Sequence, residues 1–342
     1  MYSLVLQLFI IIAIVITCIS RERPGNENEL FPREYSGTIA GLSTILIILH
    51  HFSSNVVFDG NLLRGGYENL GYACVTVFFF ISGYGTANGF ALSREYKKQF
   101  WTHKVKTIII PYVISYLVYA LLYVATGYTR KLNLVTNLLT GSPAVLFSWY
   151  IIALLLMYLF FYVSWSDSLN LVRFIILGGI YVFVTAIVLR YPTNWYGTII
   201  AFYIGALIRL YSDKLKVKYN VAVYIILSAI LIICYWQTID YSKTIKWLSL
   251  EIIATIALSI LLFLFSSKIR FRDKNVLHRI NKYGLEIYLY HGIFITAFTM
   301  VNVKNGFFVY LAPIVCVTGC LIFGVIMHWV DGKVVKLIFD RK

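Results

Sequence analysis

The sequence predicts an all-α protein, a polytopic bundle of about 10–11 helices that cross a lipid bilayer. Of its 342 residues, 60% are hydrophobic and only 13% are charged, whereas a soluble domain carries about 25% charged residues. The apolar residues also form long runs that follow one another almost end to end, and a helix needs roughly 20 such residues to cross the hydrocarbon core. We therefore expect a single integral-membrane domain over residues 1–342.

Eleven apolar runs are candidate spans, and each should be helical because a helix pairs its own backbone groups in lipid. Residues 3–19 lack the basic start and the small-residue cleavage site of a signal peptide, so we expect a retained helix. Region 130–147 could hold a re-entrant piece. The other candidates are residues 36–56, 69–91, 107–126, 145–164, 172–190, 195–211, 220–238, 246–266, 283–300 and 307–329.

The basic residues predict the orientation of these spans. With the N-terminus outside, 23 of the 30 Lys and Arg residues fall in cytoplasmic loops, in agreement with the positive-inside rule. We therefore place the N-terminus outside and the C-terminus in the cytoplasm. The net charge of +15 does not indicate a nucleic-acid partner, because short basic clusters between apolar runs are typical of cytoplasmic loops that contact membrane lipid.

The five cysteines do not suggest a metal site. Most fall within apolar runs, and none stands beside metal-type partners, so we expect small buried hydrophobic side chains. They are Cys18, Cys74, Cys234, Cys316 and Cys320.

Polar side chains inside a membrane are costly, so each is a functional candidate. The span 36–56 carries a polar stripe that should face the bundle interior. His51 and its neighbour His50 lie towards the outer end, and a histidine there can act as a base because its unperturbed pKa is about 6.5. The alternative is a structural histidine bonded to another helix. The stripe consists of Gly37, Thr44 and His51, beside Ser36, Ser43 and His50.

The stretch Phe78–Tyr84 is followed by Gly85 and Gly89, a GxxxG spacing that lets helix backbones approach closely. Packing alone would account for these small residues. Ser82 and Tyr84 are the candidates for substrate contact within the stretch.

A basic hairpin precedes the span 107–126 and is expected in the cytoplasm. It suits phosphate groups or, equally, the headgroups of anionic lipids. Its cations are Lys97, Lys98, His103, Lys104 and Lys106.

The stretch Tyr283–His291 carries a second histidine. Tyr288 and His291 are three residues apart and can line one helix face. Glu286 lies nearer the expected cytoplasmic end, where it could be solvated, and Glu251 could lie at the interface in the ninth span.

These motifs, in this order, resemble the acyltransferase-3 family of membrane acyltransferases, and specifically its fucose 4-O-acetylase-like members. The resemblance covers about residues 33–327. His51 aligns with the family's histidine at the end of its first helix, and the segment 78–84 is similar to its FFxxSG motif. The other matches are Lys104-Val105-Lys106 with Ile110-Pro111-Tyr112, Ser148-Trp149-Tyr150-Ile151, Phe202-Tyr203-Ile204-Gly205 and Glu286 to His291.

The resemblance implies O-acyl transfer in a bacterial plasma membrane. The donor would be acetyl-CoA, with no permanently bound cofactor, and the acceptor a hydroxyl of a cell-surface polysaccharide or a lipid-linked glycan. His51, His50 and His291 are then candidate catalytic residues, and the hairpin lysines are candidates for the CoA phosphates. Ser82, Tyr84, Trp149, Tyr288 and Glu286 are candidates for substrate contact.

Two features depart from the family pattern. The family usually has a basic residue eleven positions before its histidine, and that position is Ala40 here, or Ile39 if His50 is the matching histidine. The helix expected at 3–19 is also additional to the usual ten.

Two other functions remain open on the residues alone. One is a transporter or flippase of a glycan or glycolipid, which would move its substrate without using acetyl-CoA. The other is haem binding, with His50, His51 or His291 as axial ligands.

Overall fold

The computed structural model describes residues 2–20, 31–56, 67, 70–211, 221–240, 245–301 and 307–340. These residues form helices and connecting turns, with no strand among them, so the all-α prediction is confirmed. Six helical segments in these ranges are long and apolar enough to cross a membrane, and the chain is a multi-pass membrane protein. They are Arg33–Asn55, Leu70–Leu92, Arg94–Ala125, Leu171–Val188, Leu248–Ser266 and Leu311–Phe339.

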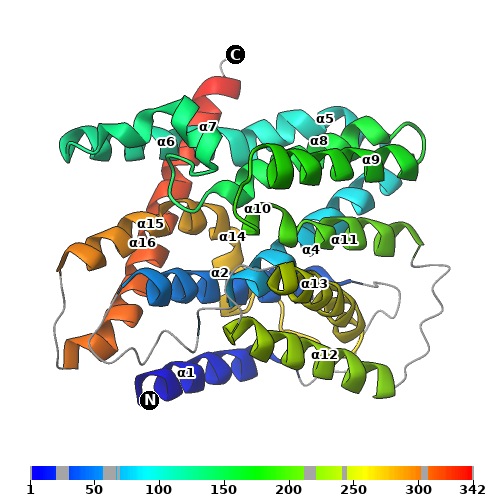
Figure 1. Cartoon of the computed structure of the whole chain (residues 1–342), viewed down its shortest axis with the longest axis horizontal. Coiled ribbons are helices and arrows are strands. Elements are labelled where there is room, and N and C mark those ends of the chain that lie inside the picture. Colours follow the sequence, from blue (N-terminus) through cyan, green and yellow to red (C-terminus); the bar gives the residue numbers. More distant parts are fainter. Residues whose placement is uncertain are drawn as a thin grey trace. The chain divides into compact units, whose positions relative to one another are not determined.

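Each expected span contains a helix (Figure 1), but the span 195–211 is divided between α10 (Asn194–Gly197) and α11. The bounds are α1 Tyr2–Cys18, α2 Arg33–Asn55, α4 Leu70–Leu92, α6 Ile110–Ala125, α8 Trp149–Ser164, α9 Leu171–Phe183, α11 Ile200–Tyr211, α12 Val221–Asp240, α13 Ile245–Ser266, α15 Gly284–Val301 and α16 Phe307–Phe339.

Shorter helical segments connect these helices. The charged helix α5 (Arg94–Lys104) continues through the π-helical segment η1 (Val105–Ile109) into α6. The π-helical segment η3 (Val184–Val188) continues α9 in the same way. The remaining connectors are η2 (Thr129–Leu132), α7 (Leu134–Thr140), α10 (Asn194–Gly197) and α14 (Val276–Lys282).

All five cysteines are buried, as the sequence predicted, and each is a free thiol. The outer surface of α6 and α9 is apolar. Leucine, isoleucine and valine side chains occupy much of the exposed area of these two helices. Exposed apolar faces of this extent are expected where lipid, rather than water, surrounds a helix.

The chain folds as two compact units. The first comprises Met1–Phe78 and Ile260–Lys342, and α2 packs there against α14, α15 and α16. Glycine allows the approach of α14, because a Cβ atom added to Gly41 would lie 1.9 Å from the carbonyl oxygen of Leu277. Gly37 contacts the His278 ring in the same way. The small residues on α2 therefore have a packing role in addition to any chemical one.

The second unit, Phe79–Ser259, brings α4 and α11 into backbone contact. A Cβ atom on Gly83 would lie 2.0 Å from the Phe202 carbonyl oxygen, and one on Gly205 would lie 2.2 Å from that of Phe80. An added Cβ on Gly85 would meet nothing within 4 Å. The expected packing role is therefore wrong for Gly85 but confirmed for Gly89, where an added Cβ would lie 2.4 Å from the Tyr96 ring of α5. The backbone contact between α4 and α11 is made at Gly83 and Gly205.

Region 130–147 forms η2, the short helix α7 and a loop. Gly141 ends α7 in a left-handed conformation with φ of 62°, which glycine adopts without strain. The Trp195 indole donates a hydrogen bond to the Gly141 carbonyl at 3.0 Å and ties this loop to α10.

Candidate functional site

Three histidines meet in the first unit, between α2 and α15. The ring of His51 lies 5.1 Å from that of His291, measured between centroids, and 4.8 Å from that of His50. Residues about 240 positions apart in the chain are thus brought together. The expectation that the polar stripe faces the interior is confirmed for Gly37, Ser43 and Thr44, which are buried, whereas Ser36, His50 and His51 are partly exposed.

His50 is held by the segment that leads into α4. Its Nδ1 lies 3.0 Å from the Tyr67 carbonyl oxygen. Because a carbonyl only accepts hydrogen bonds, Nδ1 carries the proton and Nε2 is the acceptor nitrogen of the neutral ring. Gly71 lies against the same ring, since an added Cβ would be 2.5 Å from His50 Nε2. This fixed position favours a supporting role for His50.

His291 is fully buried. Its Nδ1 donates a hydrogen bond to the Tyr288 carbonyl oxygen one turn earlier in α15. The same argument makes Nε2 the basic nitrogen of His291. The Tyr288 ring lies 5.4 Å from the His291 ring, so the two residues are neighbours, as their spacing predicted.

Close packing of α2 and α15 makes this meeting of rings possible. A Cβ added to Gly284 would lie 3.3 Å from the Thr44 hydroxyl, which itself donates to the Ala40 carbonyl at 3.0 Å. Ala40 occupies the position of the family's basic residue and is buried. A long basic side chain would displace packed neighbours there.

Glu286 faces α16 and is not solvated, contrary to expectation. It is 5% exposed, and its Oε1 lies 2.9 Å from His328 Nδ1. Asp331, also buried, lies one turn along α16 from His328. His328 and Asp331 were not among the predicted site residues, although two polar residues three apart in an apolar helix are a usable signal. Glu251, expected at the interface, is buried as well.

The remaining candidates for substrate contact belong to the second unit. Tyr84 is buried and stacks on Phe80 with ring centroids 6.5 Å apart. Trp149 is partly exposed, and its ring lies 6.2 Å from that of Trp195. Ser82 is partly exposed. Each of these three residues stays a candidate on sequence grounds.

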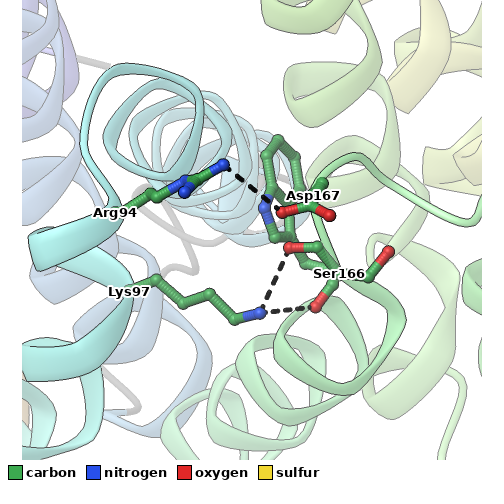
Figure 2. Close-up of polar contacts among 5 residues, drawn as sticks. Arg94, Lys97, Ser166 and Asp167 are labelled. Atoms are coloured by element: carbon green, nitrogen blue, oxygen red, sulfur yellow. Dashed lines mark hydrogen bonds and ion pairs between the residues drawn. The ribbon is translucent and has the colours of Figure 1, made fainter.

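The basic hairpin expected before the span 107–126 is wrong, because its four lysines lie in one continuous helical segment, Arg94–Ala125. The structure also gives these lysines different surroundings. Lys97 and Lys98 line a cleft at the start of α5, where Lys97 donates to the carbonyl oxygens of Trp165 and Ser166 (Figure 2). Lys104 instead stacks on the Tyr158 ring at 3.9 Å. Lys106 lies within the π-helical segment η1, a type of irregularity that is frequent at functional sites.

A comparison with known protein families decides the identity. The model of the family described as an acyltransferase domain matches residues 40–329, which is most of the chain. The chain belongs to the acyltransferase-3 family. The predicted family is thereby confirmed. No curated protein and no solved structure gives a significant match.

The matched range contains both the histidines and the basic segment α5–η1 of this acyltransferase. Helix α1 lies outside it. In chemical terms, the site offers two imidazoles with ring centroids 5.1 Å apart, a buried one on His291 and a partly exposed one on His51. An imidazole with a basic Nε2 can accept a proton from a hydroxyl, which is what acyl transfer to an alcohol requires.

Proposed function

We propose that this membrane acyltransferase transfers an acetyl group from acetyl-CoA to a hydroxyl of a cell-surface polysaccharide or lipid-linked glycan. The observation that carries the proposal is the His51–His291 pair inside an acyltransferase domain. Ionisable side chains within the helices of a membrane protein are costly, and catalysis is a common reason for their presence. We place the enzyme in a bacterial plasma membrane with its N-terminus outside.

The proposed reaction needs a single base. His51 accepts the proton of the acceptor hydroxyl while its oxygen attacks the thioester carbonyl. The carbon–sulfur bond then breaks, and the proton passes from His51 to the sulfur, which leaves as the thiol of CoA. A positioned base of this kind contributes about 10²–10⁴-fold to the rate. The alternative is an acyl group carried covalently on His51.

His291 has a supporting role in this scheme. Its ring is oriented by the hydrogen bond to Tyr288 and faces His51. It can therefore hold the His51 ring in position or stabilise its protonated form through the acceptor nitrogen Nε2.

The test uses the purified enzyme in lipid nanodiscs with acetyl-CoA and bacterial surface glycans. We expect release of the CoA thiol together with an O-acetyl ester, which NMR detects on the glycan. His51→Ala should lower both by at least about 10²-fold. His278→Ala is the control, since this histidine packs against Gly37 outside the cluster.

Two results would contradict the proposal. Near-normal transfer by correctly folded His51→Ala would exclude this residue as the base. Movement of a glycan lipid across vesicles without consumption of acetyl-CoA would favour the transporter alternative.

A further inference from the structure

An open cleft of about 810 Å³ lies in the second unit where α5 begins. Its walls come from the ends of α4, α8 and α11 and from the loop after α8. Small-molecule sites in proteins typically have volumes of about 300–1,000 Å³. The cleft is therefore large enough for a nucleotide.

The cleft carries a net positive charge. Its lining includes three cations, Arg94, Lys97 and Lys98, and one carboxylate, Asp167. The cleft also contains Ser93, the N-cap of the eleven-residue helix α5. The backbone N–H groups and the dipole at a helix N-terminus favour an anion in the same place.

Two of the cations have exchangeable partners. Arg94 lies 3.8 Å from Asp167, and both side chains are 93% exposed (Figure 2). Lys98 lies 3.7 Å from Glu95 in a similarly exposed pair. Exposed pairs of this kind contribute little to stability, so a phosphate can replace the carboxylates at small cost.

Lys97 has a different role from the one its charge suggested. Its ammonium group donates to the carbonyl oxygens of Trp165 at 2.8 Å and of Ser166 at 3.3 Å. These bonds hold the loop after α8 against α5, as Figure 2 shows. Lys97 is therefore a positioning residue for the cleft wall rather than a ligand of phosphate.

Aromatic rings form another part of the wall. Trp165 and Tyr162 line the cleft, and packing fixes both rings. Trp165 stacks on Phe161 with centroids 5.5 Å apart, and Tyr162 stacks on Phe100 at 6.1 Å. A preorganised aromatic face binds a planar base by stacking.

We propose that this cleft binds the nucleotide end of the acyl donor. Arg94 and Lys98 contact its phosphates, and Trp165 or Tyr162 stacks on its adenine. The inference rests on the proposed function, because it takes the donor to be an acyl-CoA with a phosphorylated adenosine. It also assigns Asp167 as the group that the phosphates displace from Arg94.

The probe is adenosine 3′,5′-bisphosphate, which has neither the acyl group nor the pantetheine arm. Its binding to the full-length protein in phosphatidylcholine nanodiscs is followed by calorimetry and by quenching of tryptophan fluorescence. The double variant Arg94→Glu with Lys98→Glu should bind at least about tenfold more weakly. Trp165→Leu should weaken binding about fivefold and remove most of the quenching.

Asp167→Asn should change the affinity for the probe in the opposite direction. Removing the competing carboxylate should tighten binding by about two- to fivefold. The charge control is Lys333→Glu, in which the mutated cation stacks on Trp329 in the first unit. This control should bind the probe as the wild type does.

Equal binding by the wild type and the double variant would overturn the inference. The inference would also be overturned if anionic lipid in the nanodiscs abolished binding of the probe to every variant. The cations would then serve lipid headgroups. The proposed function can fail independently of this inference. His51→Ala should bind the probe normally, and an enzyme that acetylates glycan without binding the probe would refute the cleft alone.

Discussion

The histidine cluster of the first unit and the basic cleft of the second unit are built in opposite ways. In the cluster, His291 is fully buried, and glycines bring the helices together. In the cleft, Arg94 and Asp167 are almost fully exposed and form a loose pair. A buried centre is sensitive to shape, because neighbouring atoms leave no alternative position. An exposed charged cleft is sensitive to charge and to salt.

Of the changes that test this comparison of the two sites, removal of His291 should have the largest effect on activity. We expect His291→Ala to lower kcat by about 10²-fold, because the ring that faces His51 is lost. Binding of adenosine 3′,5′-bisphosphate should not change. Steady-state kinetics and calorimetry on one preparation measure the two quantities. A parallel loss of both would mean that the variant is misfolded or that the two sites are not independent.

A matched pair of glycine variants tests the role of shape in the second unit. Gly83→Ala should destabilise the protein by about 1–3 kcal/mol, because the new methyl group meets the Phe202 carbonyl. Gly85→Ala should change stability by less than about 0.5 kcal/mol, because it faces open space. Thermal unfolding in detergent measures the difference. Equal stability of the two variants would show that Gly83 is not a packing residue.

Salt should produce the smallest effect. The KM for acetyl-CoA should rise by a few fold between low salt and about 1 M, where the Debye length falls to about 3 Å. The kcat should change less, since His291 is fully buried and the His51 ring lies against it. Initial rates over a range of sodium chloride concentrations give both constants. A salt-independent KM would argue against exposed cations as donor ligands.

The positions of the helices followed from the sequence. Ten of the eleven expected spans coincide with one helix and the span 195–211 with two, because a run of apolar residues in lipid has few other ways to pair its backbone groups. The contact between Tyr288 and His291 could also be predicted, since residues three apart lie on one face of a helix. Contacts of this kind depend only on local geometry.

The helix partners could not be predicted in the same way. Gly85 and Gly89 have the spacing of a packing motif, yet Gly83 meets the backbone of α11. Lys97 and Lys104 are lysines of the same basic segment, yet Lys97 holds a loop and Lys104 stacks on Tyr158. These differences depend on which helix lies opposite, and that is set by the packing of segments far apart in the chain.

The sequence by itself determined that this protein is a membrane-spanning helical acyltransferase, because composition, apolar run length and motif order are properties of the chain alone. It also supplied His51 and His291 as separate candidates. Only the tertiary structure brought these two rings together, buried Glu286 against His328 and separated Lys97 from Lys104. The physical reason is that burial and pairing of polar groups are decided by the side chains of neighbouring helices.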